Sequence, residues 1–142
     1  KVIRKIPSGS IVRLGGMTDC FQPIESRCHI TYEAIKELNK QGIGYLIVTK
    51  SSMVADDKYI RLMDKKLAHI QISITTMDDD LSRTYERACL PSQRINALEK
   101  LQQCNFDVSL RLSPFIPQYI DFKKLNTIKC DKILVEFLRV NT

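Results

Sequence analysis

The stretch "TYEAIKELNKQGIGYLIVTK" (31–50) joins a helix pattern directly to a strand pattern, and this succession decides the fold class. Apolar side chains recur in it at helical spacing, Thr31 is placed to cap the helix, and Gly42 is placed to end it. The run that follows, "YLIVT" (45–49), is apolar and β-branched, as in a buried strand. A helix therefore leads straight into a strand.

The same succession repeats along the chain. Further strands are predicted at "SIVRL" (10–14), "IQISI" (70–74), "DVSLRL" (107–112) and "KILVEFL" (132–138). Further helices are predicted at 56–67 and 92–105, with Asp56 and Ser92 as their N-caps, and a shorter one at about 121–128. Alternating strands and helices of this length predict a parallel sheet with right-handed crossovers.

Two α/β architectures fit these repeated βα units. One is an arc of a TIM-like barrel, and the other is a complete doubly wound domain of the flavodoxin-like kind. Residues 1–142 are expected to form one domain in either case. Ligands bind beyond the carboxyl ends of the strands in both architectures, so the residues after each strand are the candidates for function.

Composition narrows the possible functions. The net charge of +6 favours an anionic partner, although "DKYIRLMDKKLAH" (57–69) mixes both signs as a solvated helix face does. The five cysteines form no C-x-x-C pair, which argues against a disulfide scaffold and a structural zinc site and predicts a reduced, cytoplasmic protein. No apolar run is long enough to span a membrane.

Polar and glycine-rich segments follow the predicted strands. Gly15 and Gly16 permit a close approach of the backbone to a ligand, and Lys50 offers a positive charge. The hydroxyls of Ser73 and Thr75 can both donate and accept hydrogen bonds. Together these groups suit a small ligand that carries a carboxylate and an ammonium or hydroxyl groups.

Five segments in order carry a family resemblance: "GGMTDCFQPIE" (15–25), "IVTKS" (47–51), "ISITTMDD" (72–79), "YERACLPSQRINAL" (85–98) and "LSPFIP" (112–117). In these segments the chain resembles the radical S-adenosylmethionine enzymes, in the branch similar to spore photoproduct lyase. The resemblance covers about residues 10–140. It implies a partial barrel of six strands, of which this chain would hold strands two to six.

The resemblance also implies roles for individual residues. The backbone of Gly15 and Gly16 would meet the amino group of S-adenosylmethionine, and Lys50 and Ser73 would hold its carboxylate. Thr75 and Arg111 would face the ribose or the substrate. The substrate-side candidates are Asp19, Gln22, Glu25 and Glu136. No catalytic residue and no metal ligand is identified.

The activity implied by the resemblance is reductive cleavage of S-adenosylmethionine. A reduced 4Fe-4S cluster would produce a 5′-deoxyadenosyl radical, which abstracts hydrogen from a substrate, with nucleic acid as the candidate. Members of the family hold this cluster with a C-x-x-x-C-x-x-C loop, and the sequence contains no such spacing. We therefore expect a fragment of a longer core, inactive alone because thiolates are needed to hold the cluster.

Two other function classes stay open. The chain could be a non-catalytic flavodoxin-like binding or signalling domain, or a basic nucleic-acid-binding module whose affinity falls steeply with salt. If the first barrel strand is absent, the 10–14 strand has an unpaired edge. Another copy of the chain or an upstream segment is expected to cover that edge.

Several polar residues are expected to have no function beyond the fold. Glu86 and Arg94 are interpreted as a surface ion pair worth about 0 to 1 kcal/mol. His29 and His69 have no partner at a spacing that favours metal binding or acid–base chemistry, so both are interpreted as structural.

Overall fold

The computed structural model describes residues 3–7 and 9–137, which form one five-stranded parallel sheet. Its strands, in chain order and in sheet order, are β1 (Ile11–Leu14), β2 (Gly44–Thr49), β3 (Ala68–Ile74), β4 (Asp107–Phe115) and β5 (Ile133–Phe137). A doubly wound flavodoxin-like sheet would place its second strand outside its first. The flavodoxin-like alternative is therefore wrong, and the sheet is an arc of a TIM-like barrel.

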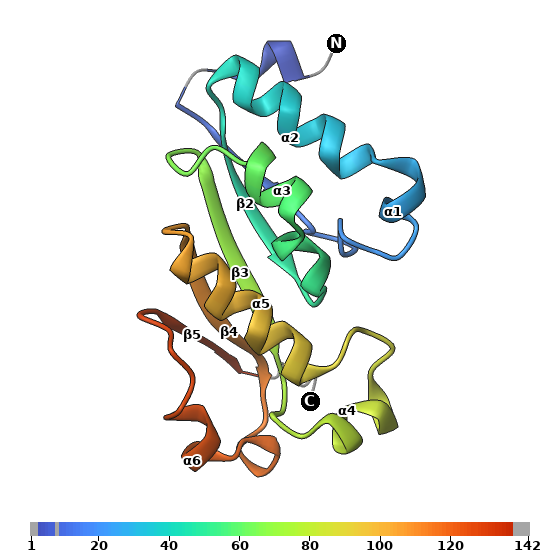
Figure 1. Cartoon of the computed structure of the whole chain (residues 1–142), viewed down its shortest axis with the longest axis vertical. Helices are drawn as coiled ribbons and strands as arrows, with labels where there is room; N and C mark the ends of the chain where they lie inside the picture. The colour runs from blue at the N-terminus through green and yellow to red at the C-terminus, as the bar shows by residue number, and fades with distance from the viewer. Residues whose placement is uncertain (1–2, 8, 138–142) are drawn as a thin grey trace, which may run out of the picture.

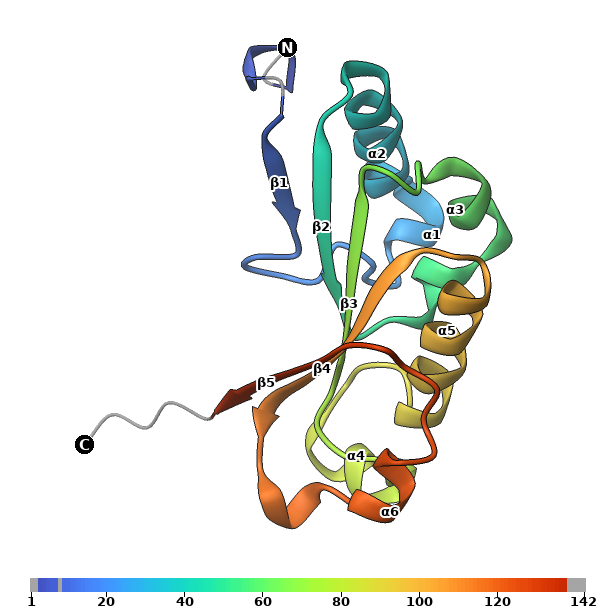
Figure 2. The same cartoon turned by 90° about the vertical axis from the view of Figure 1, so that its left-hand side faces the viewer.

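The helices all lie on one side of this sheet, as Figure 2 shows with the sheet seen nearly edge-on. They are α1 (Glu25–Cys28), α2 (Ile30–Gln41), α3 (Asp57–Leu62), α4 (Asp79–Tyr85), α5 (Pro91–Gln103) and α6 (Phe122–Leu125). Short 3₁₀ turns, η1 (Ile3–Lys5), η2 (Ser52–Ala55) and η3 (Pro117–Tyr119), complete the connections. Figure 1 shows α2, α3 and α5 in front of the strands. The opposite side of the sheet, here called the inner face, carries no helix in the described residues.

The hydrophobic core fills the space between the sheet and the helices. Alternate residues of β3, such as Ile70 and Ile72, point into this core and are at most 1% exposed. Leu98 and Leu101 of α5 face them and are fully buried. The residues between them on β3, including Gln71, point to the inner face because strand side chains alternate.

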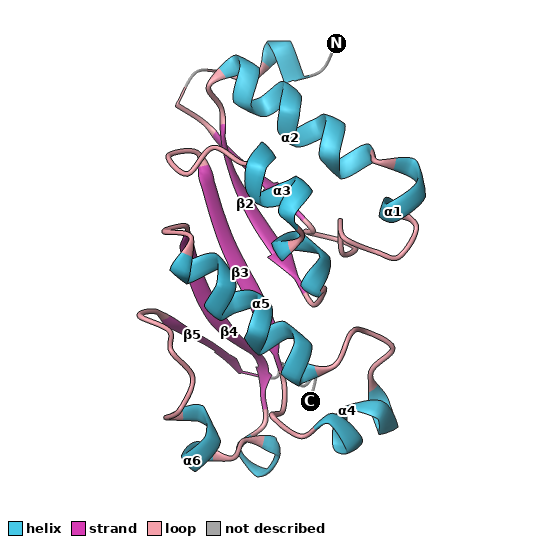
Figure 3. Ribbon diagram, in the orientation of Figure 1, coloured by secondary structure: helices cyan, strands magenta, loops and turns pink. Residues whose placement is uncertain are grey.

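The sequence predicted the strands and the helices α2, α3, α5 and α6, shown in Figure 3, but it did not predict α1 and α4. Gly42 ends α2 in the left-handed conformation, with φ of 62°, and Asp121 caps α6 by accepting from two backbone N–H groups. The helix predicted at 56–67 is shorter than expected. It stops at Leu62 because the Asp64 side chain accepts from the backbone N–H of Lys66 and closes a turn.

Two predicted N-caps are wrong because their side chains bond elsewhere. The Thr31 hydroxyl donates to the carbonyl of Cys20 at 2.5 Å, and α2 already begins at Ile30. The Ser92 hydroxyl donates to Asp79 at 2.6 Å, and α5 begins at Pro91, where the missing N–H costs nothing.

β1 and β5 form the two edges of the sheet in the described residues. Every residue of β5 is exposed, with Ile133 at 50% and Phe137 at 70%. The predicted last residue of this strand, Leu138, lies outside the described residues. The cover expected over the β1 edge, from another copy or an upstream segment, stays a prediction. No helix in the described part is long and apolar enough to cross a membrane.

Candidate functional site

Five of the predicted site residues meet in one hollow at the carboxyl end of the sheet, on its inner face. We call this feature the rim hollow. It has a volume of about 180 Å³, and its walls come from the β1–α1 loop and the ends of β2, β3 and β4. Its lining residues are Gly15, Met17, Thr18, Asp19, Val48, Thr49, Lys50, Ser73 and Arg111. The resemblance thus named residues that are distant in sequence but adjacent in space.

Gly15 is required at the start of the β1–α1 loop for two reasons. Its φ of +86° lies in the region that residues with a Cβ rarely adopt. A Cβ at this position would also lie 2.4 Å from the carbonyl oxygen of Val48. The glycine therefore lets the loop pack directly on the end of β2. Gly16 has only the Arg13 side chain near it, at 3.9 Å, and is not among the residues that line the rim hollow.

Asp19 fastens this loop to the end of β2, an arrangement that we call the Asp19 clamp. One carboxylate oxygen accepts from the Phe21 backbone N–H at 2.9 Å and from the Thr49 hydroxyl at 2.7 Å. The other oxygen accepts from the Lys50 backbone N–H at 2.7 Å. Both oxygens are therefore occupied, and the side chain positions the loop within the wall of the hollow.

The Lys50 side chain leaves the strand end and pairs with Glu86, which follows α4. The same Glu86 oxygen accepts from the Thr75 hydroxyl at 2.9 Å, and its other oxygen pairs with Arg94. Burial alone would raise the pKa of Glu86, but hydrogen bonds from Lys50 and Arg94 hold that pKa below its usual value. Glu86 is thus a carboxylate that stays ionised in the fold.

Arg94 corrects the expectation of a surface ion pair with Glu86. Its side chain is fully buried, and that of Glu86 is 7% exposed. Arg94 also donates to the carbonyls of Cys89 at 2.7 Å and of Ser73 at 3.1 Å. The guanidinium therefore ties the loop before α5 to the β3 residue that lines the rim hollow. The interpretation as a surface pair was wrong because the spacing of two charged residues in sequence does not indicate how deeply their side chains are buried.

Arg111 and Glu136 form the opposite wall of the site, across β4 and β5. Arg111 donates to the Ser73 hydroxyl at 3.3 Å and pairs with Glu136, which also accepts from the Ser113 hydroxyl at 2.8 Å. Lys50 and Arg94 share Glu86, and Arg111 pairs with Glu136. With Asp19, which accepts from the Lys50 backbone N–H, three carboxylates surround the three cations. A rim that is balanced in charge suits a ligand that carries both signs.

Thr75 and Gln22 lie beside the rim hollow rather than in it. Thr75 lines an adjoining hollow with Lys50, Tyr85 and Tyr119, and its hydroxyl lies 2.8 Å from that of Tyr85. Gln22 lines a separate cavity of about 480 Å³ that Asp19 and Lys50 also border. Lys50 borders all three spaces. A ligand that entered either neighbouring space would still contact this lysine.

Glu25 lies away from all of these spaces, inside the layer of helices. It is 3% exposed, and its carboxylate accepts from the backbone N–H groups of Thr31 and Tyr32, each at 2.9 Å. It also accepts from the Tyr59 hydroxyl at 2.7 Å. These three hydrogen bonds give Glu25 a structural role in the fold. They leave its carboxylate no open side toward a substrate.

Glu25→Gln is expected to lower the free energy of unfolding at pH 7 by about 2 kcal/mol, as for a hydrogen bond to a charged group. Burial raises the pKa of Glu25, but its three donors together lower it below the usual value. The stabilisation is therefore complete above a pH of about 4.3 and is lost as the pH falls through the lower folded pKa. Urea unfolding at pH 7 and at pH 3 measures the difference.

The exposed Glu33, paired with Lys36 on α2, supplies the control variant Glu33→Gln. It is expected to change stability by less than about 0.5 kcal/mol at either pH. A cost of Glu25→Gln that was equal at pH 7 and pH 3 would contradict the assignment.

The donor groups of the rim fit S-adenosylmethionine but not an iron–sulfur cluster. In the described residues no three His, Cys, Asp or Glu side chains are grouped so as to hold a metal ion. The five cysteines are free thiols, of which only Cys28 lies in a helix and the other four lie in loops. A methionyl group, in contrast, carries an ammonium and a carboxylate, and the rim offers backbone groups at Gly15 beside Lys50 and Arg111.

The fold of the chain is similar to that of solved structures. Spore photoproduct lyase complexed with dinucleoside spore photoproduct superimposes on 90% of the chain with a TM-score of 0.68 and 15% sequence identity. The fold is that of the partial barrel of spore photoproduct lyase. A double mutant of spore photoproduct lyase with bound AdoMet and dinucleoside spore photoproduct matches 78% of the chain, with a TM-score of 0.57 and 16% identity.

The chain spans 39% and 32% of the lengths of these two structures of spore photoproduct lyase. No protein-family model matches the chain, and no curated protein matches it by sequence. The likeness to spore photoproduct lyase is thus one of fold.

Proposed function

We propose that this chain is the S-adenosylmethionine-binding arc of a radical S-adenosylmethionine enzyme related to spore photoproduct lyase. The observation that carries the proposal is the rim hollow, where Gly15, Lys50, Ser73 and Arg111 meet at the carboxyl ends of parallel strands. Ligands of α/β barrels bind at this end. The similar structure of spore photoproduct lyase with bound AdoMet supports the choice of ligand.

The roles of the residues follow from their chemistry. The backbone of Gly15 and Gly16 would take the ammonium side of the methionyl group, since no side chain stands between this backbone and the ligand. Lys50 would hold the carboxylate, with the Ser73 hydroxyl as a second donor. Arg111 and Thr75 would approach the ribose or the substrate. Glu86 holds Lys50 in place, and Glu136 holds Arg111 in place, before the ligand binds.

The described residues include no three His, Cys, Asp or Glu side chains grouped so as to hold a 4Fe-4S cluster, so we assign to this chain the binding and orientation of S-adenosylmethionine only. When present, such a cluster supplies the electron for cleavage of the sulfonium. We propose that the intact enzyme acts on a nucleic-acid-like substrate, which the +6 charge and the dinucleoside bound by spore photoproduct lyase support. The alternative of a basic nucleic-acid-binding module needs free cations for phosphates, whereas the rim cations are paired with carboxylates.

Lys50→Met tests the proposal directly. Loss of a charged hydrogen bond to the carboxylate is expected to weaken S-adenosylmethionine binding by about tenfold or more. Isothermal titration calorimetry of the chain measures the dissociation constant. The control is Lys36→Met on the exposed side of α2, which is expected to bind as the unmodified chain does. Equal affinities of the two variants would contradict the role of Lys50, and no binding by the unmodified chain would contradict the proposal.

Asp19→Asn tests the Asp19 clamp. An amide group would turn one of the two acceptor oxygens into a donor facing a backbone N–H or the Thr49 hydroxyl. We expect the Lys50 amide proton to exchange with solvent about tenfold faster and S-adenosylmethionine to bind about tenfold more weakly. Hydrogen exchange and calorimetry measure the two effects. Faster exchange with unchanged affinity would show that the clamp serves only the fold.

A further inference from the structure

The inner face continues below the rim hollow as a series of polar layers. Paired strands place His69 opposite Asp107, Gln71 opposite Ser109, and Ser73 opposite Arg111. Inward-facing positions of TIM barrels are ordinarily filled by branched apolar side chains that pack into a solid core. Side chains that can donate and accept hydrogen bonds occupy these positions on β3 and β4. The inner face is therefore suited to contact with a polar ligand along its length.

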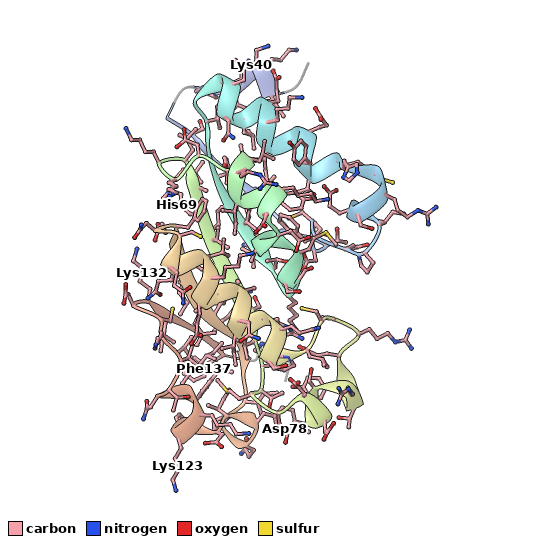
Figure 4. The ribbon with its side chains drawn as sticks, viewed as in Figure 1. Lys40, His69, Asp78, Lys123, Lys132 and Phe137 are labelled. Atoms are coloured by element: carbon pink, nitrogen blue, oxygen red, sulfur yellow. The ribbon has the colours of Figure 1, made fainter. Side chains whose placement is uncertain are left out.

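The lowest layer brings together three charged or ionisable side chains. Asp107 lies 2.6 Å from the ring nitrogen Nδ1 of His69 and also pairs with Lys132, which precedes β5. Hydrogen bonds from Lys132 and then from His69 lower the pKa of Asp107. Figure 4 shows His69 and Lys132 on the same side of the molecule. The charge of Asp107 is thus matched by that of Lys132.

The middle layer holds two polar side chains without a hydrogen-bond partner in the described residues. Ser109 is only 9% exposed, and neither its hydroxyl nor the Gln71 amide bonds to another residue of the described part. Both line a cavity of about 180 Å³, here called the lumen cavity, with Leu46 as an apolar wall and His69, Asp107 and Lys132 below. No fully buried side-chain nitrogen or oxygen in the described residues lacks a partner, so the polar ends of this pair are open to the cavity and free to bond to a ligand.

We propose that the lumen cavity binds the hydrogen-bonding edge of a nucleobase of the substrate, an inference that rests on the proposed function. The Gln71 amide offers a donor and an acceptor side by side, as in bidentate contacts of glutamine with adenine, and Ser109 offers a hydroxyl that can do either. The balanced charge of Asp107 and Lys132 favours a neutral ring over a phosphate.

Size and position agree with this choice of ligand. Sites for drug-sized ligands have volumes of roughly 300–1,000 Å³, so the smaller lumen cavity has room for the edge of one nucleobase. Gln71 and Ser109 lie two residues before Ser73 and Arg111 on the same strands, which is about 6.6 Å along the sheet. A base in the lumen cavity would therefore lie directly below a ligand in the rim hollow.

Nucleoside titration followed by ¹H–¹⁵N NMR tests the inference on the complete chain without any cluster. Thymidine and adenosine are the probes, each beside ribose 5-phosphate as a ligand that lacks a base. We expect at least one nucleoside to shift the backbone amides of Gln71 and Ser109 and the Gln71 side-chain amide. The variant with Gln71→Met and Ser109→Ala is expected to bind that nucleoside about tenfold more weakly. Gln103→Met, on an exposed position of α5, is the matched control and is expected to change nothing.

The outcomes separate this inference from the proposed function. Shifts from ribose 5-phosphate equal to those from the nucleosides, or no nucleoside shifts at Gln71 and Ser109, would overturn the nucleobase site even if S-adenosylmethionine binds. Nucleoside binding without S-adenosylmethionine binding would retain the site and contradict the proposed function. Tighter binding of a short single-stranded oligonucleotide than of the free nucleoside would identify nucleic acid as the source of the base.

Discussion

Arg94→Met is expected to lower the free energy of unfolding by about 3–5 kcal/mol, the largest stability effect in the molecule. The reason is that the variant removes a fully buried guanidinium and leaves the Glu86 carboxylate, 7% exposed, without one of its two charged partners. Lys50 would still contact Glu86, but it cannot replace the bonds from Arg94 to the carbonyls of Ser73 and Cys89. The total free energy of unfolding of a domain of this size is about 5–15 kcal/mol. Urea unfolding measures the change.

Two further variants make this prediction decisive even if Arg94→Met unfolds. Arg83→Met removes an arginine whose pair with Asp80 on α4 is exposed, and it is expected to cost less than about 1 kcal/mol. Adding Glu86→Gln to Arg94→Met removes the buried carboxylate charge that Arg94 had contacted and is expected to recover part of the lost stability. A cost for Arg94→Met as small as that for Arg83→Met would contradict the buried ion pair.

Gly15→Ala is expected to abolish S-adenosylmethionine binding in calorimetry and to cost about 1–3 kcal/mol of stability from the unfavourable φ. The added Cβ would lie 2.4 Å from the Val48 carbonyl oxygen, so the loop must lift off the end of β2. The rim hollow would then lose one wall.

Gly9→Ala is the matched control for this substitution. Gly9 has a similar φ of +81°, but a Cβ there meets no atom within 4 Å. We expect a comparable cost from backbone strain and unchanged ligand binding. If both variants bound S-adenosylmethionine equally well, the close approach at Gly15 would have no role in the site.

The strands and helices of the barrel arc could be predicted because each of them depends on residues that are close together in sequence. The run "YLIVT" (45–49) and the apolar period of the preceding helix are set by neighbouring residues, and Gly42 ends that helix through its own backbone conformation. What sequence periodicity left open was whether the sheet is a barrel arc or doubly wound, because strand order depends on crossovers over whole βα units. The observed order decides between the two.

The contacts of the site could be predicted only in part, since most of them join residues far apart in the chain. His69 was interpreted as structural for want of a partner, yet it lies against Asp107, 38 residues away on the next strand. Asp19 was named as a candidate, but its bonds to Thr49 and Lys50 span about 30 residues. Strand register could have indicated the first of these contacts, because the parallel pairing of β3 with β4 places His69 opposite Asp107.

The central claim is that the rim hollow binds S-adenosylmethionine, and ¹H–¹⁵N NMR titration of the complete chain with S-adenosylmethionine tests it most directly. We expect the backbone amides of Gly15, Gly16, Lys50, Ser73 and Arg111 to shift together and to saturate at one dissociation constant. Amides on the helix-covered side, such as those of α2, are expected to stay in place. Saturating shifts that map elsewhere, or no shifts at millimolar ligand, would contradict the account.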